Sequence, residues 1–202
     1  MSDWIIGTIT DWGYVGIFFL MLVENVFPPI PSELIMPFAG YVAASGQLST
    51  FGVMVAGVAG SLLGTSLWYI AARLLGIERF RRLCNFFGRV ATITENDIDM
   101  AVRWFDRYGV WAVLIGRLIP AIRTLISVPA GLAAMPVWKF IAISLVGTTI
   151  WTGLLTGAGL VLHEGYHIVE AYVDPVSTGV VVLCVVIYVY RFITWKPIRD
   201  IG

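Results

Sequence analysis

Charge is scarce in this sequence. Only 13% of the 202 residues are charged, whereas 58% are hydrophobic, and the formal net charge is zero. A chain without excess positive charge lacks the electrostatic footprint of a nucleic-acid-binding protein. So large an apolar fraction also exceeds what a soluble domain needs to fill one core. The composition therefore predicts an integral membrane protein.

Cysteine, histidine and N-terminal basic residues are also nearly absent. The two cysteines, Cys84 and Cys184, show no metal-ligand spacing, and a disulfide framework is not expected. The first twenty residues contain no lysine or arginine, so we expect no cleaved signal peptide with a positive leader. Nothing in these patterns calls for a metal or a cofactor.

Long uncharged runs are abundant instead. A transmembrane helix needs roughly 20 predominantly apolar residues. Runs of this length predict three spans, at Phe51 to Ala72, Phe140 to Leu162, and Val176 to about Thr194.

Two further apolar stretches are interrupted by charge and proline. Residues 14–45 are broken by ENVFPPIPSE, and residues 108–136 are broken by GRLIPAIRT. Each half is about 9 to 15 residues long, too short to cross a bilayer and too apolar to remain in water. Such lengths predict re-entrant or discontinuous helices, which membranes tolerate where protein or a wet cavity covers the broken backbone.

The two interrupted stretches resemble each other. Each has an aromatic-glycine entry, a charged residue eight positions after a glycine (Glu24 after Gly16, Arg117 after Gly109), a proline-containing break and a proline-to-glycine exit. Further along, GTSLW at 64–68 matches GTTIW at 147–151. These matches predict an internal repeat.

Orientation follows from the arginines. Seven of the thirteen basic residues lie between residues 73 and 107 and three more near the C-terminus, which places both segments in the cytoplasm. With both basic segments in the cytoplasm, each interrupted stretch must enter and leave the membrane on the same side. The two stretches are then re-entrant hairpins of opposite orientation, each followed by a span, which is an inverted repeat of the kind that transporters use. The prediction is thus an all-α integral membrane protein with one domain, 1–202. Its parts are repeat one at about 10–76, a cytoplasmic amphipathic linker lying at the interface at about 77–107, repeat two at about 108–162, an external loop at 163–175 and a C-terminal helix at about 176–195.

The first break carries the candidate acidic residues Glu24 and Glu33. Ionisable groups flanked by so much apolar sequence are costly and commonly mark a substrate or ion path. Pro28, Pro29 and Pro31 are predicted to unwind the backbone and expose carbonyls and a helix N-terminus to a ligand. The alternative is that both acids cap helix ends at the headgroup boundary.

The second break supplies the opposite charge. Arg117 and Arg123 lie on either side of Pro120, and a break at this proline would turn both toward one point. Two converging guanidinium groups suit a phosphate, because arginine donates bidentate hydrogen bonds to its oxygens. Two alternatives remain open: the arginines reach lipid headgroups, or they form salt bridges with Glu24 and Glu33.

Taken together, the motifs E-N-x-F-P-P-I-P-S-E and G-R-x-I-P-x-x-R-T-x-x-x-x-P-A-G resemble those of the DedA family, which is related to the VTT-domain lipid scramblases. The resemblance covers about residues 10–160, and the first motif is most similar to that of members transporting undecaprenyl phosphate. It implies that the family's membrane-embedded acids fall on Glu24 and Glu33 and its essential arginines on Arg117 and Arg123.

The predicted function is a flippase, not an enzyme, that returns undecaprenyl phosphate across the bacterial cytoplasmic membrane for reuse in cell-wall synthesis. The phosphate would meet the two arginines while the tail stays among membrane lipids. An embedded carboxylate is a candidate for proton coupling, although sodium coupling also fits. The alternative substrate is a phospholipid such as phosphatidylethanolamine. Trp68 and Trp151, matched in the repeat, are candidates for either packing or substrate contact.

One motif favours a different class of protein. The sequence HEGYH, with His163, Glu164 and His167, matches the zinc-protease pattern in which two histidines one helical turn apart bind the metal. Gly165 weakens the required helix, so zinc proteolysis stays a remote alternative.

Overall fold

The computed structural model describes residues 2–26, 32–87, 95–119, 122–161, 186, 189–190 and 192–194. Among these residues every regular element is a helix and there is no strand. The helices are α1 (Ser2–Val26), α2 (Ser32–Ala44), α3 (Thr50–Phe87), α4 (Glu95–Arg117), α5 (Ser127–Leu132) and α6 (Val137–Val161). The prediction of an all-helical membrane protein is confirmed.

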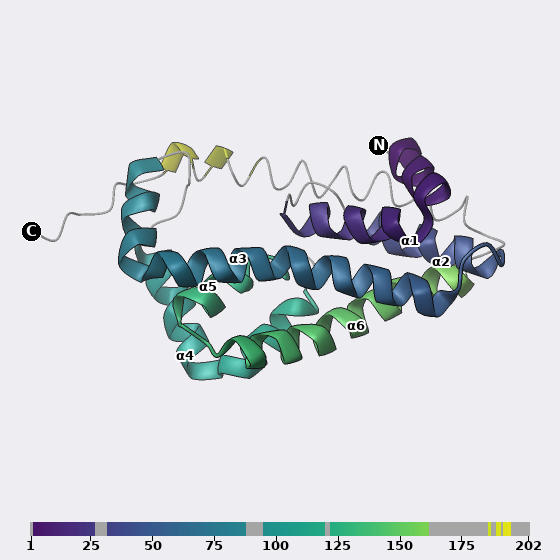
Figure 1. Ribbon diagram of the computed structural model, residues 1–202. Coiled ribbons are helices and arrows are strands. Elements are labelled where there is room, and N and C mark those ends of the chain that lie inside the picture. Colours follow the sequence, from purple (N-terminus) through teal and green to yellow (C-terminus); the bar gives the residue numbers. More distant parts are fainter. Residues whose placement is uncertain are drawn as a thin grey trace, which may run out of the picture.

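Three of these helices are long and apolar enough to cross a membrane. Their candidate spans are Trp4–Val26, Thr50–Cys84 and Val137–Val161. The second contains the span predicted from Phe51 and the third overlaps the span predicted from Phe140, and they form the two long rods of the molecule (Figure 1). Of the predicted C-terminal helix, residues 186, 189–190 and 192–194 are helical and the others lie outside the described part of the chain.

The first candidate span is divided by a glycine. Gly13 has φ 55° and ψ −126°, a conformation that costs little only without a side chain. The helix folds back there, so its first segment stands across the second (Figure 1). The remaining 13 residues, 14–26, extend about 20 Å, whereas the hydrocarbon core is about 30 Å thick.

Gly109 makes the equivalent break in α4, with φ 46° and ψ −112°. Gly13 and Gly109 thus kink α1 and α4 with similar backbone angles. Gly16, the glycine eight positions before Glu24, has no positive φ and lies within α1.

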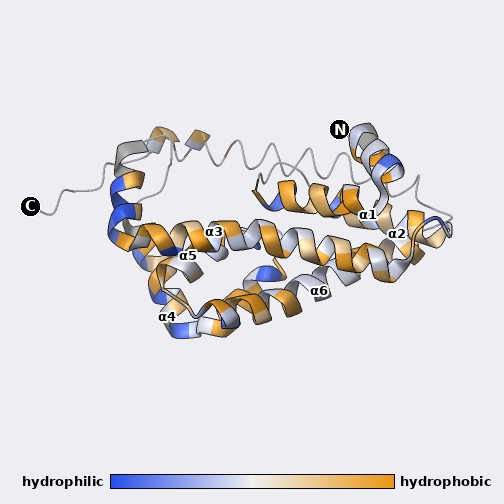
Figure 2. Cartoon of the chain, in the orientation of Figure 1, coloured by the Kyte–Doolittle hydropathy of each residue, from blue (hydrophilic) through white to orange (hydrophobic). Residues whose placement is uncertain are grey.

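The helices before Gly109 and after Gly76 form a polar end of the molecule. Gly76 also has a positive φ, and both α3 and α4 change direction at this end (Figure 1). Hydrophilic colour gathers on these two segments, while the long rods are largely apolar (Figure 2). An ion pair between Arg81 and Asp99 joins them. They fall within the stretch predicted to be amphipathic.

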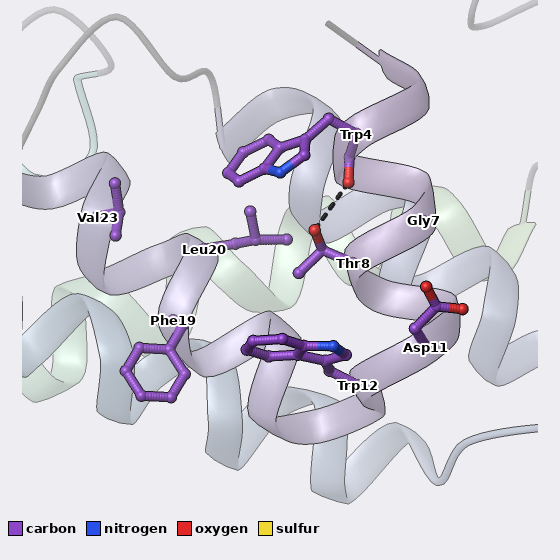
Figure 3. Close-up of a pocket in the computed structure, with 8 residues that line it drawn as sticks. All are labelled: Trp4, Gly7, Thr8, Asp11, Trp12, Phe19, Leu20 and Val23. Atoms are coloured by element: carbon purple, nitrogen blue, oxygen red, sulfur yellow. Dashed lines mark hydrogen bonds between the residues drawn. The ribbon is translucent and has the colours of Figure 1, made fainter.

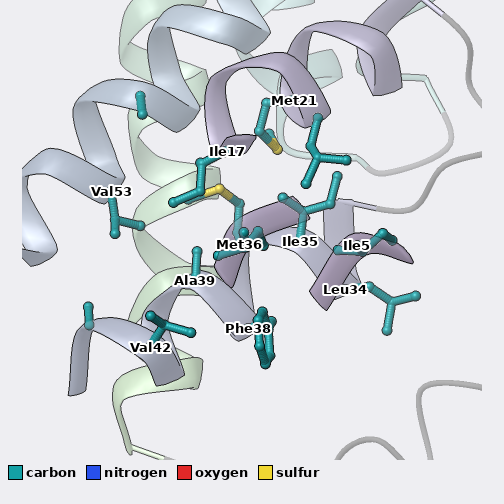
Figure 4. Close-up of a cluster of buried hydrophobic side chains, with 14 residues drawn as sticks. Ile5, Ile17, Met21, Leu34, Ile35, Met36, Phe38, Ala39, Val42 and Val53 are labelled. Carbon is teal, nitrogen blue, oxygen red and sulfur yellow. The ribbon is translucent and has the colours of Figure 1, made fainter. Parts of the chain in front are cut away.

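The packing is reciprocal between the two halves of the chain. In the first half, α1 packs on α3 and α2 packs on α6; in the second half, α4 packs on α6 and α5 packs on α3. The short helices α2 and α5 therefore each lie against the long helix of the other half of the chain. A large apolar cluster joins α1, α2 and α3 (Figure 4). A smaller cluster around Tyr69 and Phe140, whose rings stack with centroids 4.2 Å apart, joins the second half to α3.

A glycine in each of the two short helices, α2 and α5, permits the contact with the long helix. A Cβ on Gly40 of α2 would lie 2.3 Å from the carbonyl oxygen of Thr156, and one on Gly131 of α5 would lie 2.4 Å from that of Tyr69. These are the exit glycines of the two interrupted stretches. Their backbone-to-backbone contact with the opposite long helix is the reason that a side chain is excluded at both.

Two glycines on α6 provide a direct test of this packing. A Cβ on Gly159 would lie 2.0 Å from the carbonyl oxygen of Pro37, whereas a Cβ on Gly157 meets nothing within 4 Å. We expect Gly159→Ala to lower the free energy of unfolding by about 1–3 kcal/mol through overpacking. The matched variant Gly157→Ala should be neutral or stabilising, since alanine is the better helix former. Thermal unfolding in detergent measures both, and equal melting temperatures would contradict this packing.

Candidate functional site

A buried ion pair joins the two interrupted stretches. Glu24 lies near the end of α1, and Arg123 lies in the turn segment between α4 and α5. An Arg123 Nη2 nitrogen contacts Glu24 Oε1, and the two side chains are 7% and 5% exposed. The bend that follows α4 thus directs Arg123 toward the first half of the chain, and one of the salt bridges left open by the sequence is present.

Asn25 fixes the carboxylate of Glu24. Its Nδ2 donates to Glu24 Oε2 at 2.5 Å and to the carbonyl oxygen of Met21 at 2.8 Å. Asn25 is only 1% exposed, and its Oδ1 has no hydrogen-bond partner among the described residues. Sequence reasoning missed this residue, although it stands beside Glu24 in the first motif.

Arg117 is buried without an acidic partner. It is 3% exposed, and it forms no ion pair within the described ranges. Its Nη2 contacts the hydroxyls of Ser144, at 3.0 Å, and Ser127, at 3.4 Å, and its Nε has no partner there. The guanidinium lies 5.5 Å from the ring centroid of Phe140. The hydrogen-bond partners of Arg117 among the described residues are therefore neutral.

A small cavity lies between these groups. It has a volume of about 10 Å³, which is room for about one water molecule. The residues that line it come from α1, α3, α4, α6 and the turn after α4: Asn25, Ser61, Arg117, Arg123, Thr148 and Trp151. Both predicted arginines therefore face one point, as the interrupted second stretch indicated.

Glu33 occupies a different position from Glu24. It lies in the first turn of α2, and it is half-buried. It forms no ion pair with any described residue. The structure thus brings Glu24, Arg117 and Arg123 together and places Glu33 at the start of α2.

Several predicted residues lie outside the described part of the chain. These are the four prolines of the two breaks and the zinc-binding pattern, namely Pro28, Pro29, Pro31, Pro120, His163, Glu164 and His167. Among the residues that are described, no group of three or more His, Cys, Asp or Glu side chains is placed to hold a metal.

A second, larger hollow of about 360 Å³ lies at the fold of α1. Figure 3 shows Trp4 and Trp12 beside Leu20 and Phe19, with Asp11 on the rim. No lysine or arginine of the described ranges lines it. The hollow therefore lacks the cationic groups that an anion would require, and the buried charge cluster is the stronger candidate site.

The arrangement defines a class of protein. Helices long enough to cross a membrane surround two arginines and one carboxylate, all three less than a tenth exposed. Charged groups this deep in an apolar helical protein are typical of a path for an ion or a charged substrate. The molecule is a membrane protein with a buried, net positive site.

Comparison with known proteins gives the family. The VTT domain model matches residues 27–161, which include Arg117, Arg123, Glu33 and the long helices. The chain belongs to the VTT-domain (DedA) family, and the resemblance drawn from its two motifs is confirmed.

Individual relatives carry two kinds of name. The undecaprenyl phosphate transporter A of Staphylococcus aureus is 36% identical over 188 residues, covering 92% of this chain and 93% of the relative. Its namesake in Bacillus subtilis is 31% identical over 188 residues, covering 93% and 91%. A protein of Lactococcus lactis subsp. cremoris named alkaline phosphatase-like is 37% identical over 190 residues, covering 94% and 89%. No solved structure matches the chain.

Proposed function

We propose that this protein is a flippase that carries undecaprenyl phosphate across the bacterial cytoplasmic membrane. The observation that carries the proposal is Arg117, a buried guanidinium without an acidic partner among the described residues. An unpaired buried charge is costly, so its retention at this depth favours a transient anionic ligand. A phosphate suits it, because guanidinium donors match phosphate oxygens. The names of the two transporter relatives support the same substrate.

The proposed architecture is an inverted repeat of two re-entrant hairpins. Residues 14–26 and 32–44 form one hairpin, and residues 110–119 and 122–132 form the other. Support comes from the reciprocal packing of the short arms and from the matched exit glycines. Further support comes from the GTSLW and GTTIW segments: a Cβ on Gly64 would lie 2.7 Å from that of Asn25, and one on Gly147 would lie 2.8 Å from that of Arg117. Each long helix thus approaches the end of its own hairpin's first arm at the same repeat position.

Orientation in the membrane follows from the basic residues. The polar end formed after Gly76 and before Gly109 carries Arg79, Arg81, Arg82, Arg103 and Arg107. Basic residues near membrane spans favour the cytoplasmic side. In this orientation the second hairpin enters from the cytoplasm and the first from outside. Their ends bring Glu24 and the two arginines together between the long helices.

The mechanism we propose is an exchange of anions at Arg123. In the structure the carboxylate of Glu24 forms an ion pair with the guanidinium of Arg123, and the cavity beside them has room for only about one water molecule. A phosphate is larger than this cavity, so it enters only when the carboxylate withdraws. Protonation of Glu24 would neutralise the carboxylate and free the guanidinium for the phosphate. Substrate binding and proton uptake would then be linked, with Glu33 as the neighbouring acid that delivers or accepts the proton.

Transport in proteoliposomes tests the proposal. We expect purified protein to move labelled undecaprenyl phosphate between leaflets faster than protein-free liposomes, and an imposed pH gradient to change the net rate. The variant Glu24→Gln should move the lipid at a rate that does not depend on the pH gradient, because an amide does not take up or release a proton in this pH range. An unaltered response in Glu24→Gln would contradict the coupling role. Movement of phosphatidylethanolamine but not of undecaprenyl phosphate would contradict the substrate.

A further inference from the structure

Three buried polar atoms that have no hydrogen-bond partner in the described part of the chain belong to residues that line the same cavity. They are Asn25 Oδ1, Arg117 Nε and the indole nitrogen Nε1 of Trp151. Two of the three are donors. A buried donor without an acceptor is destabilising, and in native structures it usually indicates a missing water or ligand. Donors from two different helices at one cavity indicate a ligand that accepts several hydrogen bonds.

Trp151 differs from Trp68, its counterpart in the repeat, in the bonding of its indole N–H. Trp68 donates its indole N–H to the backbone carbonyl of Asn25 at 3.1 Å, so its polar group is satisfied within the fold. The ring of Trp151 lies beside the guanidinium of Arg123, with 5.9 Å between the guanidinium carbon and the ring centroid, and its N–H is left over. The same residue type at the same repeat position thus has a structural bond in one half and a spare donor in the other.

We propose that Trp151 is a further phosphate-binding residue, and that its indole N–H makes this site selective for phosphate monoesters over phosphate diesters. The inference rests on the proposed function, because it places the substrate phosphate between Arg117 and Arg123. A monoester has three non-bridging oxygens and a diester has two. The two guanidinium groups each bind one oxygen, and the Trp151 N–H binds the third, which only a monoester presents as an anionic acceptor.

The selectivity has a physical basis in the burial of the site. When a diester binds, the Trp151 N–H faces an esterified oxygen, a poorer acceptor than an anionic one, and water is excluded from supplying another partner. A site built to hydrogen-bond a particular group discriminates strongly against an analogue that lacks it. Most membrane phospholipids are diesters, so this one donor would let the protein reject the lipids that surround it in large excess.

Binding measurements on the intact purified protein test the inference. The probes are farnesyl phosphate, a monoester, and its methyl ester, a diester with the same tail, titrated calorimetrically in detergent. We expect the wild type to bind the monoester more tightly. Trp151→Phe keeps an aromatic ring beside Arg123 but removes the donor, and it should weaken monoester binding roughly 10- to 100-fold, as expected for a lost hydrogen bond to a charged group. Binding of the diester should not change.

Two further variants complete the test. Trp68→Phe is the matched control. In this variant the ratio of the monoester affinity to the diester affinity should stay at its wild-type value. Trp151→His at pH 8, where histidine is neutral and keeps one N–H, should retain a preference for the monoester, and it serves if Trp151→Phe folds poorly. An unchanged ratio in Trp151→Phe, or equal weakening of both ligands, overturns the inference while the proposed function stands. If the wild type binds neither probe, both fall.

Discussion

Replacing Arg117 with methionine is expected to abolish transport of undecaprenyl phosphate and to leave the protein at least as stable as the wild type. Methionine has a similar length and can fill the same space. The substitution removes a buried charge whose hydrogen-bond partners among the described residues are serine hydroxyls, and replacing buried charges by apolar groups is often neutral or stabilising. Loss of a charge-assisted contact with phosphate should reduce the rate about 100-fold or more.

The opposite directions of the two effects make this prediction specific. Initial rates of lipid movement in proteoliposomes and melting temperatures in detergent would be measured on the same preparations. Arg107→Met is the matched control, because Arg107 is an exposed arginine on the same helix and lies outside the site. We expect that variant to transport within about twofold of the wild type. A marked loss of stability in Arg117→Met would show that Arg117 has a structural partner and would remove the main support for a phosphate site.

Removing one member of the Glu24–Arg123 pair should have the largest effect on stability. Both side chains are buried, and breaking a buried pair costs about 3–5 kcal/mol because the remaining charge is left unpaired. We therefore expect Glu24→Ala to lower the free energy of unfolding by about this amount. Two unpaired arginines would then share one apolar site.

A double-mutant cycle separates this charge effect from lost packing. The variant Glu24→Leu/Arg123→Met removes both charges and should recover most of the stability lost in either single variant. It should remain inactive in transport, since the phosphate would have only Arg117. Additive losses in the double variant would mean that the two residues do not stabilise each other, and the anion exchange proposed at Arg123 would lose its basis.

The sequence predicted the main features of this fold because the membrane imposes strict lengths. Uncharged runs located α3 and α6, and the two interrupted stretches located the short arms. The convergence of Arg117 and Arg123 was also predicted, because a break between them allows both to face one cavity. The salt bridge between Glu24 and Arg123 was one of several alternatives, and only the packing of the two halves selects it.

Other features depend on contacts that no local pattern contains. The kink at Gly13 inside α1 had no counterpart among the predicted breaks. Ser144 and Ser127 hold Arg117 from two other elements, and serine in an apolar helix is too common to indicate such a role. A partial signal did exist on α6, where Ser144, Thr148 and Trp151 recur at spacings of four and three residues and share one face.

The contact between Gly40 and Thr156 has a consequence for biogenesis. The ribosome releases α2 more than one hundred residues before it releases the part of α6 against which α2 packs. At about 5–20 residues per second, the first short arm waits roughly 5 to 20 seconds for its partner. During that interval α2 has neither the length to span the bilayer nor the helix that later covers it. The first half of this protein can thus complete its packing only after nearly the whole membrane core has been synthesised.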